Sequence, residues 1–326
     1  MSDVTPHVPD AARDTERNTG QQIGRNRPQP MLSVIVPSVN GWSDLDACLS
    51  ALEQAESCTH TPLELLVPER CGTDVRTRLA ARYPLARVLP VSASTTIPQM
   101  RALAIDAATA PTVAVIEDHV IVPERWAQQL VEARCGDVRA VGGALVNAAT
   151  ANTVDWAAFL CEYSHVLTPR PAGPVEWLMG NNTAYDRALL QDCHQVVHAG
   201  RWEHVLHNEL RRRGITLWNR PDIVVAHKKH YTVGEYTTQR FLYARAYAAD
   251  RTQSSSTVSR VSYGAASLAL PVWLYARITS RVWRSGAHRR ELWQSLPLLA
   301  LFVTAWGLGE VIGAWFGDGG AMARVC

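Results

Sequence analysis

From residue 31 onward, short apolar segments alternate with amphipathic segments, and this alternation limits the fold more than any other feature. Residues 44–55, 74–82 and 98–108 have the apolar spacing of helices that bury one face. The segments between them are typical of strands buried on both faces and read "MLSVIVP", "LELLVP", "ARVLPV" and "TVAVIEDH". Strands that alternate with helices at this spacing predict an α/β fold, a mostly parallel central sheet flanked by helices.

The second half of the chain is less regular, but it continues the same mixture of strands and helices. We expect helices at residues 124–133, 156–165 and 203–213, the last ending at Gly214, which suits a helix C-cap. The expected strands are "RAVGGALV", part of "GPVEWLMGNNTAYDR", and one or two in "ITLWNRPDIVVAHKKH".

Composition separates the chain into three regions. Residues 1–30 are rich in polar residues and proline, contain no apolar signal segment, and predict a disordered tail. Residues 31–230 form the predicted α/β domain, and residues 231–326 form a helical, membrane-associated region. Without a secretory signal, the α/β domain is expected to stay on the cytoplasmic side of a membrane.

Bulk numbers exclude several classes of protein. Of the 326 residues, 47% are apolar and 19% charged, which allows a sizeable core. The net charge of +2 gives no basic field, so we expect no nucleic acid as a partner. The seven cysteines form no C-x-x-C pair and are expected to be reduced thiols rather than zinc ligands or disulfides.

Polar clusters follow three of the predicted strands, at "PSVN", "PERCGTD" and "EDH". The carboxyl ends of parallel strands meet at one edge of the sheet, where ligands bind in such folds. The cluster Glu117-Asp118-His119 combines carboxylates with an imidazole, which suits Mn²⁺ or Mg²⁺ with a substrate phosphate completing the coordination. The alternative for this cluster is a solvated loop at the end of a strand.

These segments together resemble the inverting glycosyltransferases of family 2, which have the Rossmann-like GT-A fold. The resemblance covers roughly residues 32–230. "SVIVPSVNGWSDLDACLSAL" resembles the opening strand and helix that help to bind the nucleotide base. "IPQMRALAIDAATAPTVAVIEDHVIVPERWAQQL" resembles the stretch that leads through an arginine into the D-x-D metal motif. "MGNNTAYDR" and "GRWEHVLHNELRRRGITLWNRPDIVVAHKKH" resemble the acceptor-side loop, the helix with the catalytic base, and the following histidine-bearing strand.

The resemblance implies a role for individual residues. Glu203 takes the position of the general base, and His227 that of a further metal or diphosphate ligand. The implied donor-binding residues are Pro37, Val39, Asn40, Glu69, Arg101, Glu117 and Asp118. The implied metal ligands are Asp118, His119 and His227, and the implied acceptor-binding residues are Gly180, Asn181, Asn182 and Trp202. For the two asparagines, a simple turn is an equal alternative.

The sequence departs from the family pattern in three places. The metal motif reads E-D-H, which leaves open which of its side chains are ligands, although Asp118 and His119 are favoured. The base is Glu rather than Asp. "PERCGTD" replaces the usual D-D-G-S segment, so that either Glu69 or Asp74 is left to read the nucleotide base.

Residues 295–316 are about 22 residues long, enough to cross a hydrocarbon core of about 30 Å. Glu310 is the single charged residue in this segment, and it is expected to face a protein partner rather than lipid. Gly309, Gly313 and Gly317 form a smooth face that suits close helix packing and suggests homo-oligomerisation. A helix in the core of a soluble protein is the alternative.

A second apolar run, residues 263–276, is shorter and contains Pro271. Arg277, Arg281 and Arg284 follow it, and they would lie outside the cell if both runs crossed the membrane, against the positive-inside tendency. We therefore expect this run to lie in the membrane interface, with a hairpin of two spans as the alternative.

The sequence thus predicts a membrane-bound glycosyltransferase of the hexosyltransferase type. It transfers a sugar from a nucleotide-diphosphate sugar, with inversion, to a lipid-linked acceptor or a growing surface glycan. A degenerate, non-catalytic binding or scaffold protein is the first rival, because E-D-H replaces D-x-D. A nucleotidyltransferase is the second, but "PSVNGWS" offers no glycine-rich, lysine-bearing phosphate loop.

Overall fold

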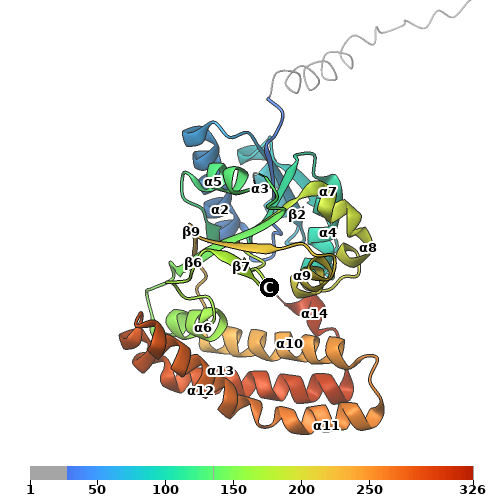
Figure 1. The fold of residues 1–326 in the computed structure, drawn as a ribbon, viewed down its shortest axis with the longest axis vertical. Helices are drawn as coiled ribbons and strands as arrows, with labels where there is room; N and C mark the ends of the chain where they lie inside the picture. The colour runs from blue at the N-terminus through green and yellow to red at the C-terminus, as the bar shows by residue number, and fades with distance from the viewer. Residues whose placement is uncertain (1–27, 135, 326) are drawn as a thin grey trace, which may run out of the picture.

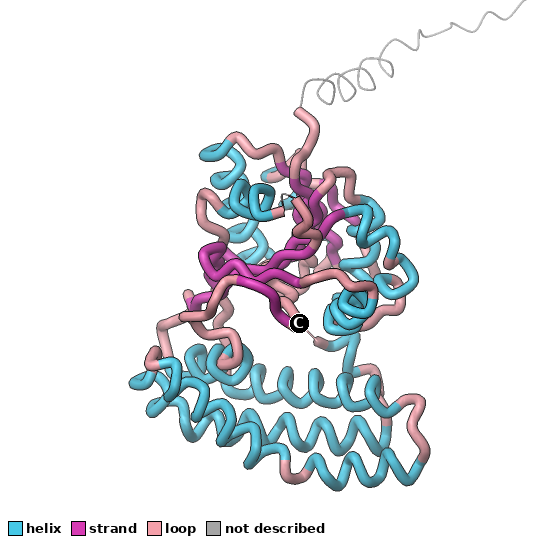
Figure 2. Tube along the Cα trace, viewed as in Figure 1, coloured by secondary structure: helices cyan, strands magenta, loops and turns pink. Residues whose placement is uncertain are grey.

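The computed structural model describes residues 28–134 and 136–325. Residues 1–27, which hold nearly all of the predicted disordered tail, lie outside this range. The described chain forms an α/β layer containing the sheet and, below it, a layer of long helices (Figure 1). Figure 2 shows that every strand lies in the upper layer.

The first four strands form the parallel half of the sheet, as the sequence predicts. They are β1 (Leu32–Ile35), β2 (Leu63–Glu69), β3 (Arg87–Pro90) and β4 (Thr112–Val115), arranged in the order β3-β2-β1-β4. All pairs among them are parallel. Right-handed crossover connections favour such pairing when a helix joins consecutive strands.

The second half of the sheet mixes strand directions. β8 (Thr183–Asp186) lies antiparallel between β4 and β6 (Ala140–Asn147), and β9 (Leu217–His227) runs parallel to β6. The short strands β5 (Val120–Ile121) and β7 (Gly173–Val175) pair antiparallel with β9. The predicted α/β fold with a mostly parallel sheet is therefore confirmed, and the antiparallel strands enter after residue 115.

Helices cover both faces of the sheet, because alternate residues of its strands point to opposite sides. In β1, Leu32 and Val34 belong to one apolar cluster with α2 (Trp42–Thr59) and α5 (Trp126–Ala133). Ile35 belongs to the cluster on the other face. That face is covered by α4 (Ile97–Ala107), α7 (Arg187–Asp192) and α9 (Glu203–Arg212). Of the remaining helices of this layer, α3 (Thr73–Arg82) connects β2 to β3, and α8 (His194–Val197) precedes α9.

The lower layer contains α10 (Val233–Thr252), α11 (Thr257–Ser267), α12 (Leu270–Ser285) and α13 (Arg289–Phe316). α6 (Thr153–Tyr163) belongs to the predicted α/β domain by sequence but packs against α13 and α12. The Tyr236 hydroxyl of α10 donates to the Ala158 carbonyl at 2.9 Å and its ring contacts Phe302. The two regions predicted to meet at residue 230 therefore share one packed interior.

The apolar run at residues 263–276 is divided between two helices. α11 ends at Ser267, and α12 begins at Leu270 with Pro271 in its first turn. Proline suits this position because the first turn of a helix has no intrahelical partner for its N–H.

α13 is the one described helix that is long and apolar enough to cross a membrane. Half of its apolar window is buried inside the protein, against α10, α6, α12 and α11. Glu310 accepts hydrogen bonds from Arg251, Tyr263 and Trp306, so it faces protein partners within the same chain.

The glycine face of α13 is covered by α10. A Cβ atom on Gly309 would lie 2.4 Å from the Phe241 carbonyl oxygen, and one on Gly313 would lie 2.2 Å from the Arg245 carbonyl oxygen. Gly317 ends the helix at a φ of 78°. The close packing expected from these glycines thus occurs within one chain, which leaves Gly309 and Gly313 unavailable to a second copy.

The C-terminal segment returns to the α/β layer through α14 (Ala321–Arg324). Ala321 and Val325 pack in a third apolar cluster with Ile97 and Trp202. Arg70 donates hydrogen bonds to the carbonyl oxygens of Thr95 and Val325. This contact ties the end of the chain to the edge of the sheet that carries the predicted site.

We predict that Gly313→Ala lowers the free energy of unfolding by about 1–3 kcal/mol, because α10 must move to admit the methyl group. Gly234→Ala in α10 is the matched control, since a Cβ there meets nothing within 4 Å. Without steric conflict, this change is neutral or stabilises the protein by up to about 1 kcal/mol. Chemical denaturation in detergent measures both; equal stability of the two variants would contradict the packing described here.

Candidate active site

The E-D-H cluster lies where β4 gives way to β5, and β9 brings His227 to it. In the antiparallel pairing of β5 with β9, Val120 lies opposite His227. The Lys228 amide donates to the His119 carbonyl at 2.9 Å. Strand pairing therefore places residues 108 positions apart in direct contact.

Glu117, His119 and His227 form a compact cluster of potential metal ligands. Their ligand atoms all lie within 4.8 Å of one another. The two histidine Nε2 atoms are 2.9 Å apart, and Glu117 Oε2 lies 3.3 Å from His119 Nε2 and 4.0 Å from His227 Nε2. Both histidines are buried, whereas the Glu117 side chain is partly exposed to a cavity.

The charges of the cluster are coupled. Burial opposes the charged form of His119, but hydrogen bonds to Asp118 and Glu117 raise its pKa to about 9. Burial, with the neighbouring His119 charge, lowers the pKa of His227 to about 3. For Glu117, burial is outweighed by the contact with His119, which lowers the carboxyl pKa to about 2. Without a metal, His119 therefore carries the positive charge of the cluster, and the carboxylates of Glu117 and Asp118 face it.

Asp118 differs from the prediction that it is a metal ligand beside His119. Its carboxylate is fully buried and accepts hydrogen bonds from the amides of Val39 and Asn40, at 2.7 and 2.8 Å, and from Asn40 Nδ2. Asp118 Oδ1 also lies 3.1 Å from His119 Nδ1. A carboxylate on Nδ1 fixes the imidazole ring and leaves Nε2 for a ligand, so Asp118 is placed to orient His119 while Glu117 takes the expected ligand position.

The residues present fit a divalent cation. Ligands at about 2.1 Å from an octahedral metal lie roughly 3 Å apart, which the shorter separations in the cluster approach. Two imidazoles with one carboxylate suit a transition metal such as Mn²⁺ better than Mg²⁺, which prefers oxygen ligands. The remaining coordination positions of the metal would be occupied by water or by oxygen atoms of the substrate.

A second charged group faces this cluster from α4 and α9. Arg101 Nη1 donates to Glu203 Oε2 at 3.1 Å, and Arg101 Nη2 donates to the Gly180 carbonyl at 3.0 Å. Arg101 also lies 4.0 Å from Glu117, so it stands between the two carboxylates. A Cβ on Gly180 would lie 2.7 Å from Glu203 Cδ, so only glycine allows this approach.

The other predicted acceptor residues have different environments. Asn181 Nδ2 donates to Glu117 and to the Tyr163 hydroxyl, while its buried Oδ1 has no partner. Asn182 is fully buried and joins β6, β9 and helix α5 through Ala144, Ile223 and Trp126, which is a structural position. Trp202 stacks on Tyr243 and Tyr247, beside the cavity.

On the predicted donor side, the loop after β1 adjoins the cluster. Pro37 leads into Val39 and Asn40, whose amides bind Asp118, and Lys229 donates to Asn40 Oδ1 at 2.7 Å. Glu69 lies on β2 and is fully buried, with its carboxylate bound to the Gly72 amide and to Arg76. Both carboxylate oxygen atoms of Glu69, which was predicted to contact the donor, are therefore bound within the chain segment that follows β2.

A cavity of about 600 Å³ connects the site to the helical layer. Its lining includes Glu117, Arg101, Gly180, Asn181 and Glu203 from the α/β layer. It also includes residues that the sequence analysis missed, among them Tyr163, Arg240, Tyr243, Trp273 and Trp306. They belong to α6, α10, α12 and α13, and no local motif marks them because the long helices reach the site through tertiary packing.

A Rossmann-like sheet with a carboxylate–histidine cluster at its strand tips, facing a second carboxylate across a cavity, defines a GT-A glycosyltransferase. The family model for glycosyl transferase family 2 matches residues 33–205. This match covers more than half of the chain, which therefore belongs to glycosyl transferase family 2. A comparison with curated proteins found no match. Family membership implies a nucleotide-sugar donor and an acceptor, and divalent metals are common in the family.

We predict that Glu117→Gln abolishes measurable Mn²⁺ binding, because it removes the ligand carboxylate. Asp118→Asn is expected to weaken binding by about 10–100-fold, as loss of an orienting partner does. Glu132→Gln is the control and should leave binding unchanged, since Glu132 is exposed on α5 and belongs neither to the cluster nor to the pockets around it. Isothermal titration or Mn²⁺ electron paramagnetic resonance measures the Mn²⁺ affinity of all three variants. A larger loss of affinity in Asp118→Asn than in Glu117→Gln would overturn this ligand assignment.

Proposed function

We propose that the protein transfers a sugar, most simply a hexose, from a nucleotide-diphosphate sugar to an acceptor hydroxyl with inversion at the anomeric carbon. The observation that carries this proposal is the shared cavity, in which Arg101 lies between Glu117 and Glu203. A cation site at one end and a carboxylate at the other are what a single displacement requires.

On the donor side, Glu117, His119 and His227 would hold Mn²⁺. When bound, the metal would neutralise negative charge that develops on the departing diphosphate. Arg101 adds a second positive charge on the same side. Val39 and Asn40 lie in the loop that adjoins the cluster and are placed to contact the nucleotide.

On the acceptor side, Glu203 acts as the general base. The acceptor hydroxyl has a pKa far above neutrality, so its proton must pass to a positioned carboxylate during attack. Glu203 is paired with Arg101 in the described state, at 3.1 Å. A donor diphosphate would compete for the guanidinium, and Glu203 would then be released toward the acceptor as the donor binds.

The outer helices support attachment to the cytoplasmic face of a membrane. Large apolar side chains are exposed on α11, α12 and α13, including Val258, Val261, Leu268, Val272, Trp273, Trp283, Trp293, Leu308, Trp315 and Phe316. Arg284, Arg289 and Arg290 lie on the same helices, where they would meet anionic headgroups. Because half of the apolar window of α13 is packed against protein, we propose that these helices dock in the interface together, rather than α13 spanning alone.

We predict that Glu203→Gln lowers kcat by about 10²–10⁴-fold, the usual contribution of a general base. Donor affinity should stay the same or increase, because Arg101 loses its competing carboxylate. Glu209→Gln, on the same helix but bound to Arg212 and Arg213, is the control and should retain activity.

The measurement is Mn²⁺-dependent release of nucleoside diphosphate from a panel of common nucleotide sugars, together with donor binding by thermal shift. Normal turnover of Glu203→Gln would refute its role as base. If the folded wild-type protein released no diphosphate from any donor and bound none of them, the rival function as a non-catalytic binding protein would be favoured.

A further inference from the structure

The wall that α12 contributes to the cavity carries two arginines that form no ion pair within the described residues. Arg277 and Arg281 both line it from α12. Among the described residues, neither guanidinium has a carboxylate within 4.0 Å, in contrast to Arg101 and Arg251, which are paired with Glu203 and Glu310. Two like charges on one wall repel each other unless an anion lies between them.

The positive charge of these arginines lowers the pKa of neighbouring groups. His165, which stacks on Trp177 at the cavity wall, has a pKa lowered to about 4 by burial and by the surrounding Arg281, Arg170, Arg277 and Arg240. Burial and the proximity of Arg277 also lower the pKa of Arg281. Arg240, at the middle of the cavity, has a buried Nε without a hydrogen-bond partner.

α12 combines this charge with an apolar surface. Leu270, Trp273, Leu274, Arg277, Ile278 and Arg281 line the cavity at helical spacing, on one face of the helix. Val272, one residue from Trp273, is 76% exposed on the outer surface. An anionic group bound by the arginines would therefore lie beside the apolar face that we propose for membrane docking.

We propose that Arg277 and Arg281, with Arg240, bind the phosphate of an amphiphilic acceptor, a lipid-linked phosphate or diphosphate whose hydroxyl-bearing end reaches Glu203. This inference rests on the proposed function, because it names the acceptor class for the same cavity. Guanidinium groups suit this role because they form paired, charge-assisted hydrogen bonds with phosphate oxygen atoms.

We predict that the wild-type protein binds farnesyl phosphate at least about tenfold more tightly than farnesol, the value of one charge-assisted hydrogen bond. The double variant Arg277→Gln/Arg281→Gln should lose this preference. Arg125→Gln is the control, because Arg125 is exposed, lies outside both the cavity and the docking helices, and should leave the preference unchanged. Isothermal titration in neutral detergent, without donor, measures these affinities.

Equal affinity for phosphate and alcohol, or an unchanged preference in the double variant, would overturn the proposal. If inorganic phosphate displaced farnesyl phosphate at an equal concentration, the proposal that the ligand is amphiphilic would be wrong. Free phosphate would then be the ligand. These affinities are measured without a donor. A negative result in them is therefore distinct from an absence of glycosyl transfer, which the diphosphate-release assay measures.

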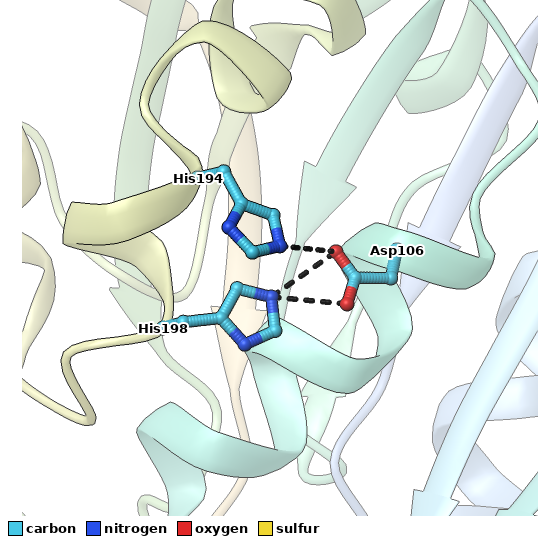
Figure 3. Close-up of side chains that lie close together, drawn as sticks. All are labelled: Asp106, His194 and His198. Atoms are coloured by element: carbon cyan, nitrogen blue, oxygen red, sulfur yellow. Dashed lines mark hydrogen bonds and ion pairs between the residues drawn. The ribbon is translucent and has the colours of Figure 1, made fainter.

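An independent cluster lies on the surface, away from the cavity. Asp106 near the end of α4 meets His194 and His198 from the α8 region, as Figure 3 shows. His198 Nε2 lies 3.0 Å from Asp106 Oδ2, and His194 Nε2 lies 3.9 Å from Asp106 Oδ1. The two imidazole rings stack at 4.1 Å, and all three ligand atoms lie within 4.8 Å of one another.

We infer that this cluster binds Zn²⁺, for which two imidazoles, a carboxylate and a water make a common ligand set. The site would join α4, which carries Arg101, to the segment that leads into Glu203 at the start of α9. A cation here would act as a clamp that holds the two elements of the active-site pair together.

We predict that one Zn²⁺ binds to a His227→Ala variant, in which the cavity cluster is disabled. Adding His194→Ala should weaken this binding by at least about tenfold, consistent with losing a ligand. Adding His60→Asn, an exposed histidine outside both clusters, should not, and asparagine tolerates its φ of 52°. Titration calorimetry and the visible absorption of the Co²⁺ form measure binding.

Unchanged affinity or an unchanged Co²⁺ spectrum in the His194→Ala form would overturn the site. Zn²⁺ should also raise the Tm of the His227→Ala variant and not that of the double variant. If Zn²⁺ bound without raising the Tm, the proposal that it holds α4 and the segment before α9 together would be wrong.

Discussion

The buried carboxylate of Asp118 is the point on which the active site depends. It accepts hydrogen bonds from two backbone amides and one side-chain amide of the loop after β1, and it also contacts the Nδ1 atom of His119. A fully buried charge is tolerated only when its oxygen atoms are satisfied in this way. The same four contacts fix the loop expected to bind the nucleotide and orient one ring of the candidate metal cluster. The donor loop and the metal ligands are thus held in one geometry before any ligand arrives.

The sequence was a good guide to the elements and to the strand tips that carry chemistry. Apolar periodicity located β1 to β4 and their helices, most strongly β1, β2 and β4, because those three strands are buried on both faces whereas β3 lies at the edge of the sheet. It also pointed to Glu117, His119, His227, Arg101 and Glu203, which the fold gathers around two pockets that share Glu117. The mixed second half of the sheet was less readable, because strand direction depends on tertiary pairing rather than on composition.

Roles within the site could not be read from the order of residues alone. Glu117, Asp118 and His119 lie in the turn between β4 and β5, where no strand or helix period tells which way each side chain points, and Asp118 alone of the three is bound by the loop after β1. Asn182 fills a junction of β6, β9 and helix α5, and no local sequence pattern predicts this contact. The spacing of Gly309 and Gly313 correctly indicated close helix packing, but spacing cannot say whether the neighbouring helix belongs to the same chain.

The helical layer gives the family fold a second wall. A GT-A sheet alone offers an open edge, whereas here α10, α12 and α13 close the far side of the cavity and α14 ties the chain end to Trp202. The wall contributes aromatic surfaces and guanidinium groups, and the opposite surface of the same helices exposes apolar side chains. Since one set of helices both lines the cavity and exposes apolar side chains outward, docking at a lipid surface and admission of the proposed acceptor would be coupled through α12. An acceptor delivered from the membrane would then approach Glu203 from the side opposite the nucleotide, as inversion by a single displacement requires.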